Sequence, residues 1–120
     1  MAPPRPGQSA LDALSPAERA AVDELVSEAR VALGDDLRDV RLFGSRARGD
    51  SDESSDVDVA LVVTQAGRQR RSVIQDLAFD LGLRHGVSLA PTVIEESLLA
   101  ELRSRERRFA LDLDEEGLAL

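Results

Sequence analysis

Cysteine, lysine, tyrosine and tryptophan do not occur in this chain of 120 residues, and phenylalanine occurs only 3 times. The absence of cysteine excludes a disulfide framework and a thiolate zinc site. Without tyrosine and tryptophan, the chain lacks the usual side chains that stack on single-stranded bases. All 15 basic residues are arginine, which by itself indicates no function, and the net charge of −8 repels polyphosphate backbones. Nonspecific nucleic-acid binding is therefore not expected.

Long apolar runs are also missing. No segment approaches the length of about 18 apolar residues that a bilayer-spanning helix needs, and "MAPPRPGQSA" lacks the apolar region of a secretory signal. We therefore expect no membrane segment and a cytoplasmic protein. The length fits one domain, for which we expect residues 15–120, and the prolines and glycine of residues 1–14 predict a flexible N-terminal leader.

Two amphipathic helices are predicted. In "SPAERAAVDELVSEARVALG", Ser15 and Glu18 form a capping box around Pro16, which predicts a helix over about residues 16–33 that Gly34 ends in the left-handed conformation. A second helix is predicted over "AGRQRRSVIQDLAFDLGLRHG". Its apolar stripe consists of Val73, Ile74, Leu77, Ala78 and Leu81, it is closed by Gly86, and His85 is expected to cap its carbonyls.

Three segments predict strands: "VRLF" within about residues 38–43, "DVDVALVV", and "VSLAPTVI", where Pro91 indicates an edge position or a bulge. The tail after residue 94 has helical character. Its expected packing residues are Leu98, Leu99, Leu102 and Phe109, with Gly117 as a stop. Strands that alternate with helices in so short a chain predict a small sheet covered by helices, of the α/β or α+β class.

Two aspartates stand at the start of "DVDVALVV". Residues i and i+2 of a strand point to the same face, so Asp56 and Asp58 would lie side by side, roughly 7 Å apart along the chain. Two ionised carboxylates so close together repel each other unless a cation lies between them. Mg²⁺ takes carboxylate and phosphate oxygens, so the pair predicts a magnesium site.

The segment "FGSRARG" directly follows a predicted strand. Gly44 lets backbone amides approach a ligand, Ser45 adds a hydroxyl donor, and Arg46 or Arg48 adds countercharge, so a phosphate would fit here. Together with Asp56 and Asp58, these residues predict a site for a nucleoside triphosphate and Mg²⁺. Each half alone has a simpler interpretation, because a Gly-Ser pair is most often a turn and Asp-x-Asp is often a solvated strand end.

These motifs resemble the signature of a known family. "GSRARG", followed by "SDVDVALVV" from Ser55, is similar to the signature of the minimal nucleotidyltransferases of the polymerase-β-like superfamily, of the antitoxin type. Residues 40–63 carry most of the resemblance, and the order of predicted elements extends it over about residues 36–94. The ending "RRFALDLDEEGLAL" resembles the closing helix and Glu-Gly-apolar segment of these small proteins.

The resemblance implies a mixed β-sheet backed by helices and the transfer of a nucleoside monophosphate, with AMP expected, from a triphosphate to an acceptor hydroxyl. It further implies that Gly44 and Ser45 bind the phosphates and that Asp56 and Asp58 are catalytic metal ligands. Similar small proteins often accompany a helical ribonuclease toxin of the HEPN type and act as antitoxins. The implied partners are therefore ATP, Mg²⁺ and a HEPN-type toxin.

The chain departs from the family pattern at one position. Active members usually carry a third carboxylate on the strand after the intervening helix, but no acid lies between Asp80 and Glu95, and Ser88 or a neighbour occupies that position. Glu95 and Glu96 are weak substitutes, because acids are also common at a helix N-terminus. Asp76 is better explained as part of a solvated helix face. Other acids are assigned likewise to solvated or ion-paired surfaces: Asp80 with Arg84, and the loop residues Asp50, Asp52 and Glu53.

Two functions remain open at this point. The first is an enzyme that transfers a nucleotide to a protein or a small molecule. The second is a catalytically impaired module that acts by binding a partner such as a HEPN-type toxin. Two arginine clusters, one at Arg70 and Arg71 and one within residues 103–108, could contact an acceptor or a partner, although solvated helix faces explain them equally well. A homodimer is also compatible with the sequence.

Overall fold

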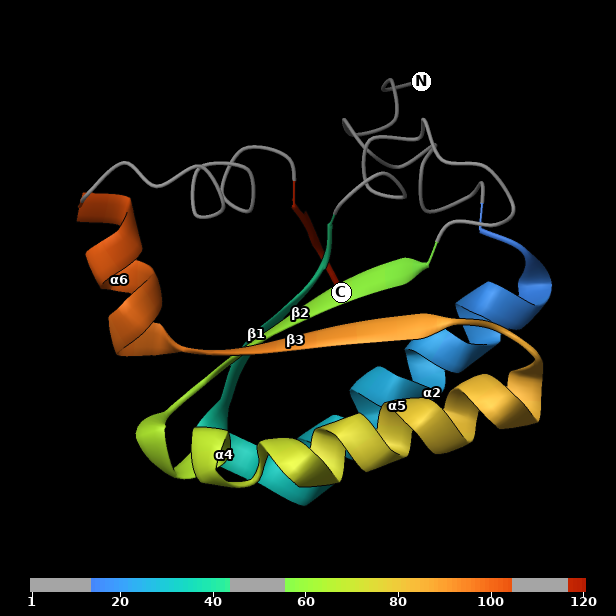
Figure 1. Cartoon of the computed structure of the whole chain (residues 1–120), viewed down its shortest axis with the longest axis horizontal. Helices are drawn as coiled ribbons and strands as arrows, with labels where there is room; N and C mark the ends of the chain where they lie inside the picture. Colours follow the sequence, from blue (N-terminus) through green and yellow to red (C-terminus); the bar gives the residue numbers. More distant parts are fainter. Residues whose placement is uncertain (1–13, 44–55, 105–116) are drawn as a thin grey trace, which may run out of the picture.

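The computed structural model describes residues 14–43, 56–104 and 117–120, which form a mixed β-sheet and its covering helices (Figure 1). The elements in chain order are α2 (Pro16–Leu33), the 3-10 turn η1 (Gly34–Asp36), β1 (Leu37–Phe43), β2 (Val57–Val63), α4 (Gln65–Gln69), α5 (Arg71–His85), β3 (Leu89–Glu95), α6 (Glu96–Ser104) and β4 (Leu118–Ala119). The predicted class, a small mixed sheet backed by helices, is confirmed. The predicted leader lies outside the described residues except for Leu14.

The sheet has four strands in the order β3-β2-β1-β4. β1 pairs antiparallel with β2 and with β4, whereas β2 and β3 run parallel. Parallel neighbours need a crossover connection, and α4 with α5 provides it. β3 is an edge strand, so the edge position expected for Pro91 is confirmed.

One face of the sheet is covered by α2 and α5, which lie side by side (Figure 1). The odd-numbered residues of β2 point to this face, and Val57, Val59, Leu61 and Val63 are all buried in its core. Leu25 of α2 and Ile74 of α5 are fully buried against them. This core fixes the register of β2, because a slip of one residue would move its valines to the other face of the sheet.

The start of α2 is as predicted. The Ser15 hydroxyl accepts a hydrogen bond from the Glu18 amide at 3.1 Å, and the Glu18 carboxylate accepts one from the Ser15 amide at 2.9 Å. The helix ends at Leu33, but the left-handed conformation expected for Gly34 is wrong. Gly34 has φ +56° with ψ −128°, because the chain turns directly into η1. Gly86, in contrast, closes α5 with φ +69° and ψ +34°, as expected.

The second predicted helix is divided into α4 and α5 at Arg70. Thr64 holds α4 in place, since its hydroxyl accepts from the Gly67 amide and donates to the Asp36 carboxylate. Gly67 lies so close to β2 that a Cβ would stand 2.8 Å from the Val63 Cβ. This packing fixes the axis of α4, and the chain must turn before it can continue along α2.

The predicted apolar stripe of the second helix is mostly correct. Ile74, Ala78 and Leu81 are buried and Leu77 is half-buried, but Val73 is 40% exposed at the edge of the helix pair.

At the tail, α6 buries Leu99 and leaves Leu98 exposed. The Leu102 side chain and Phe109 lie outside the described residues, and Gly117 stands before β4. None of the described helices combines the length and the hydrophobicity that a bilayer-spanning segment needs.

Candidate functional site

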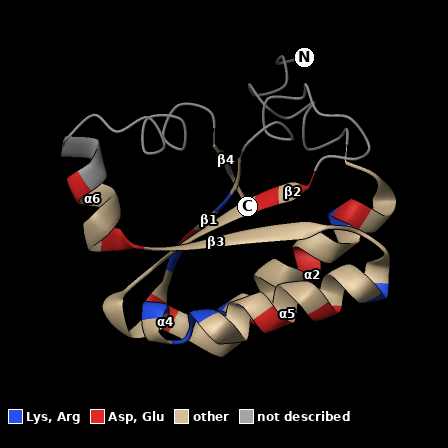
Figure 2. Ribbon diagram, viewed as in Figure 1, with Lys and Arg blue, Asp and Glu red and all other residues tan. Residues whose placement is uncertain are grey.

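The second face of the sheet carries Asp58, the second aspartate of the predicted pair. Because Val57 and Val59 point toward α2 and α5, Asp58 between them points to the opposite face. Asp56 directly precedes β2 and is exposed, whereas Asp58 is half-buried. Figure 2 shows this acidic colour at the start of β2. Both aspartates therefore lie at the same end of the sheet, away from α4.

The strand register brings the two halves of the sequence motif together. Asp58 pairs directly with Phe43, the last residue of β1, and Gly44 is the next residue in the chain. The last described residue before "GSRARG" is thus paired with an aspartate that follows it by 15 residues in the sequence. Gly44, Ser45, Arg46 and Arg48 themselves lie outside the described residues, so their roles stay predictions.

On its other side, Asp58 pairs with Ala90 of β3. Directly paired residues of neighbouring strands share a face, so Ala90 stands where a third carboxylate on this strand would meet Asp58. Ser88, the residue first considered, lies level with Asp56, and its carbonyl accepts the Val57 amide at 2.9 Å. The register therefore places Ala90 beside Asp58 and Ser88 beside Asp56 on the same face, and neither side chain is a carboxylate.

Glu95 and Glu96 cannot replace the missing carboxylate. Glu95 pairs with Val63 at the far end of β2, roughly 16 Å along the strand from Ala90. Its carboxylate accepts the Ser97 hydroxyl at 2.7 Å, and Glu96 forms an ion pair with Arg38 at 3.2 Å. The sequence could not show how far Glu95 lies from Asp58, because that distance depends on the pairing register of β2 and β3.

The acids of α5 lie on the wrong side of the sheet for this site. Asp76 and Asp80 are exposed on the helix that covers the opposite face. The predicted Asp80–Arg84 ion pair is wrong, because the Arg84 guanidinium lies 3.4 Å from Glu24 of α2. His85 also differs from the prediction, since its Nε2 lies 3.0 Å from the same carboxylate and links α5 to α2.

Sequence reasoning missed a charged pair on the site's face. Arg41 of β1 pairs with Ala60, so it lies two residues before the Phe43–Asp58 pair on the same face of the sheet. The Arg41 Nε donates a hydrogen bond to the Asp39 carboxylate at 2.7 Å. Alternation within "RDVRLF" could have indicated it, since Arg41 and Phe43 are two apart. Arg41 is the described cation whose strand position is nearest to Asp58 on this face.

A small apolar cluster limits the site along the strands. Ala60, Val62, Ile94 and Leu99 are buried together, with Phe43 packed against them. Leu99 belongs to α6, so this helix covers the half of the face that lies beyond Ala60. The half that contains Asp58 and Ala90 remains partly accessible, as their intermediate exposure shows.

The donor set fits one Mg²⁺ better than two. Two hard carboxylates can share a single ion whose remaining positions take phosphate oxygens and water. Among residues 14–43, 56–104 and 117–120, no group of three histidine, aspartate or glutamate side chains could hold a metal ion.

The sequence of the domain matches a known family. Residues 22–114 match the nucleotidyltransferase domain family. The chain belongs to that family. The match spans most of the domain and includes both halves of the predicted site, and it supports the prediction of a transferase.

Two proteins of Methanocaldococcus jannaschii, each named "Putative protein adenylyltransferase", are similar to this domain. The first is 32% identical over 77 residues, which cover 62% of this chain and 52% of the relative. The second is 32% identical over 79 residues, which cover 64% of this chain and 79% of the relative. This nucleotidyltransferase domain thus spans about half the length of the first relative.

The fold also resembles a crystal structure from Sulfolobus solfataricus described as "a putative nucleotidyltransferase". The TM-score is 0.54 with 17% sequence identity, and the match covers 99% of this chain and 89% of the other. At this level of identity the likeness concerns the fold, which the two proteins share.

Proposed function

We propose that this nucleotidyltransferase domain binds a magnesium-bound nucleoside triphosphate and transfers the nucleoside monophosphate to a hydroxyl group of an acceptor. The observation that carries the proposal is the pairing of Phe43 with Asp58, because Phe43 is the residue directly before "GSRARG" in the sequence. The names of the two M. jannaschii relatives support AMP as the transferred group and a protein as the acceptor. A cytoplasmic location is part of the same proposal.

Each part of the site has a defined role in this proposal. Gly44 and Ser45 bind the phosphates through backbone amides and a hydroxyl, and Arg46 and Arg48 supply positive charge. Asp56 and Asp58 hold Mg²⁺, which when bound neutralises phosphate charge and orients the triphosphate.

The reaction forms one bond and breaks one bond. The acceptor oxygen attacks the α-phosphorus in line with the leaving group, and the bond from the α-phosphorus to the bridging oxygen breaks. Pyrophosphate leaves with the electrons of that bond, and the acceptor hydroxyl loses its proton. Ala90 has no group to accept this proton, so we assign the base to water or to a side chain of the acceptor.

A second candidate function rests on Ala90. A domain that lacks the third carboxylate retains a nucleotide-bound ion more readily than it retains catalysis, because a second metal can then no longer be held beside the attacking oxygen. The alternative is therefore a catalytically impaired module that binds a partner protein. A HEPN-type toxin is the partner that the family resemblance suggests, and nucleotidylation or binding of that toxin would make this chain an antitoxin.

Labelled ATP separates these functions. The full chain is incubated with [α-³²P]ATP, Mg²⁺ and a purified HEPN-type protein, and transferred label is measured. Transfer that is lost in Asp58→Asn but kept in Asp35→Asn supports the enzyme, since Asp35 is an exposed acid of η1 at the other end of the sheet. Partner binding that is the same in both variants, without transfer, supports the binding module. Calorimetry that shows no binding of Mg-ATP would contradict a nucleotide site.

Ala90→Asp tests whether one missing carboxylate limits the reaction. The position is only partly buried, so an aspartate can be accommodated on the Asp58 face. We expect transfer to rise at least about 100-fold, the lower end of the range that a positioned acid or base contributes. Thr92→Asp is the matched control, because Thr92 lies on the same face one strand position farther from Asp58.

A further inference from the structure

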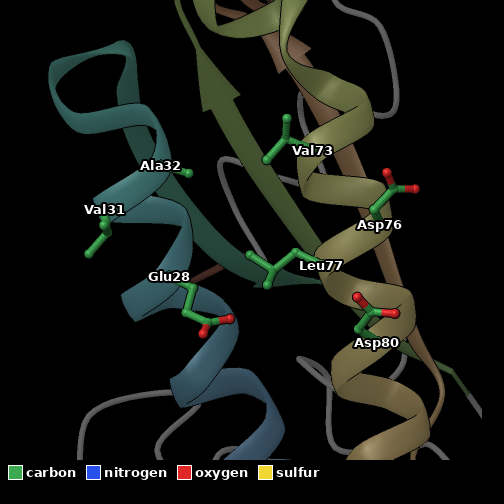
Figure 3. A pocket seen from close by; sticks show the side chains of 7 residues that line it. All are labelled: Glu28, Val31, Ala32, Val73, Asp76, Leu77 and Asp80. Atoms are coloured by element: carbon green, nitrogen blue, oxygen red, sulfur yellow. The ribbon is translucent and has the colours of Figure 1, made fainter.

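A groove separates α2 from α5 on the side of the molecule opposite to Asp58. Its volume is about 620 Å³, and its lining residues are Glu28, Val31, Ala32, Val73, Asp76, Leu77 and Asp80. Figure 3 shows Leu77 projecting between the helices, with Val73 and Glu28 leaning in from opposite walls and Val31 and Asp76 at the outer margins. The sheet lies between this groove and the proposed nucleotide site.

The floor of the groove and part of its margins are apolar. Val31 is 87% exposed and Val73 is 40% exposed, while Leu77 between them is half-buried. Single exposed apolar residues are common on protein surfaces and need no explanation. Here two of them, Val31 and Val73, line one hollow between two helices together with Leu77, which is the geometry that receives an apolar ridge of another helix.

The polar groups of the groove are all acidic. Glu28 stands on the α2 wall, and Asp76 and Asp80 stand four residues apart on the α5 wall (Figure 3). None of the three forms an ion pair or a side-chain hydrogen bond with any described residue. Glu24, one turn before Glu28, is by contrast engaged by both Arg84 and His85. The groove therefore presents unneutralised negative charge on both sides of an apolar floor, as the red positions of α2 and α5 indicate in Figure 2.

We propose that this α2–α5 groove is a docking surface for an amphipathic helix of a partner protein, in which arginine or lysine flanks an apolar ridge. The ridge would cover Val31, Val73 and Leu77, and its basic flanks would meet the carboxylates of the two walls. Charge complementarity of this kind favours a basic occupant and opposes acidic ones.

Groove-on-groove contact between two copies of this chain is opposed by charge. In such a symmetric dimer, Glu28, Asp76 and Asp80 would face the same three carboxylates of the partner copy. Nucleic acids and anionic membranes are opposed for the same reason. The groove and Asp58 are on opposite faces, so a docked helix leaves the nucleotide site open, and the inference does not depend on the proposed function.

The test uses the full chain, labelled with ¹⁵N, and three synthetic helical peptides. The first has a leucine ridge flanked by arginine, the second has the same ridge flanked by glutamate, and the third has the composition of the first in scrambled order. We expect only the first to bind, with amide shifts confined to α2 and α5. Binding of the first peptide elsewhere, equal binding of the first two, or no binding at millimolar concentration overturns the proposal.

Variants identify the groups that recognise the peptide. The double variant Asp76→Asn with Asp80→Asn should weaken binding about fivefold to tenfold, because two exposed charge pairs are lost. The control is Asp23→Asn with Asp35→Asn, which removes the same charge outside the groove and should leave Kd within twofold. An equal effect of the two double variants overturns the proposal, since it would reflect net charge alone.

Apolar recognition is tested separately. Val31→Ser should weaken peptide binding at least threefold, whereas Leu98→Ser, which changes an exposed leucine of α6, should have no effect. Both positions are exposed, so the variants are expected to fold, and circular dichroism verifies it. Chemical shifts of α2 and α5 that change on dilution of the free protein would indicate self-association through the groove and would contradict the proposed occupant.

Discussion

The two faces of the sheet differ in what covers them. Toward α2 and α5, every odd-numbered residue of β2 is buried in a continuous apolar core. On the other face, α6 covers only the half beyond Ala60, and the remaining half displays Asp58 next to Ala90. We call the face toward α2 and α5 the closed face and the face that carries Asp58 the open face. Burial of apolar side chains on the closed face stabilises the fold, whereas the open face can accept polar side chains at a smaller loss of stability.

The largest effect should come from the closed face. Leu25→Ala removes a fully buried side chain between α2 and the sheet, and we expect a loss of about 2–5 kcal/mol in the free energy of unfolding. Urea denaturation followed by circular dichroism measures it. Val31→Ala on the same helix is the control and should change stability by less than about 0.5 kcal/mol. Similar losses in both variants would contradict the asymmetry of α2.

A substitution on the open face should change nucleotide transfer and leave the free energy of unfolding nearly unchanged. Asp58→Asn removes a proposed metal ligand, so nucleotide transfer should fall at least about 100-fold, more than the loss of an outer-shell partner of a metal site usually causes. Stability should stay within about 1 kcal/mol, because the position is only half-buried. Label transfer and thermal unfolding are measured on the same preparation. A stable variant with full activity would remove Asp58 from the site.

A substitution at Gly67 tests how closely α4, the first helix of the crossover, packs against β2. A Cβ at this position would lie 2.8 Å from the Val63 Cβ and 3.0 Å from the Asp36 carbonyl oxygen. Gly67→Ala should therefore destabilise by about 1–2 kcal/mol, although alanine favours helix. Gln65→Ala in the same short helix is exposed and should have little effect. A stabilised Gly67→Ala variant would show that α4 can move away from β2.

The smallest effect is expected at the start of α2. Ser15→Ala removes the hydroxyl that accepts the Glu18 amide, and about 1 kcal/mol of stability should be lost. Ser15→Asp keeps an acceptor at this position and should restore most of the loss. Chemical denaturation resolves differences of this size between variants. If alanine and aspartate behave alike, the capping box contributes nothing measurable.

Local features of this domain could be predicted from its sequence. Ser15, Pro16 and Glu18 act within one turn of each other, so the start of α2 required no knowledge of the rest of the chain. The same holds for Gly86, where glycine tolerates the left-handed conformation that ends α5. The prediction of one continuous second helix failed, because contacts with residues distant in the sequence set the path of the backbone there. Arg70 marks a break between α4 and α5 because Gly67 packs against Val63 and Asp36, which the helical pattern of residues 66–86 does not contain.

For the candidate site, the sequence by itself determined that an Asp-x-Asp pair stands at the start of a strand and that a Gly-Ser segment precedes it. Only the tertiary structure decided that the end of β1 adjoins Asp58, that Ala90 and not Ser88 lies beside it, and that Glu95 and Glu96 are at the far end of the sheet. Alternation along a strand is a local property of the backbone, whereas register depends on contacts between residues far apart in the chain.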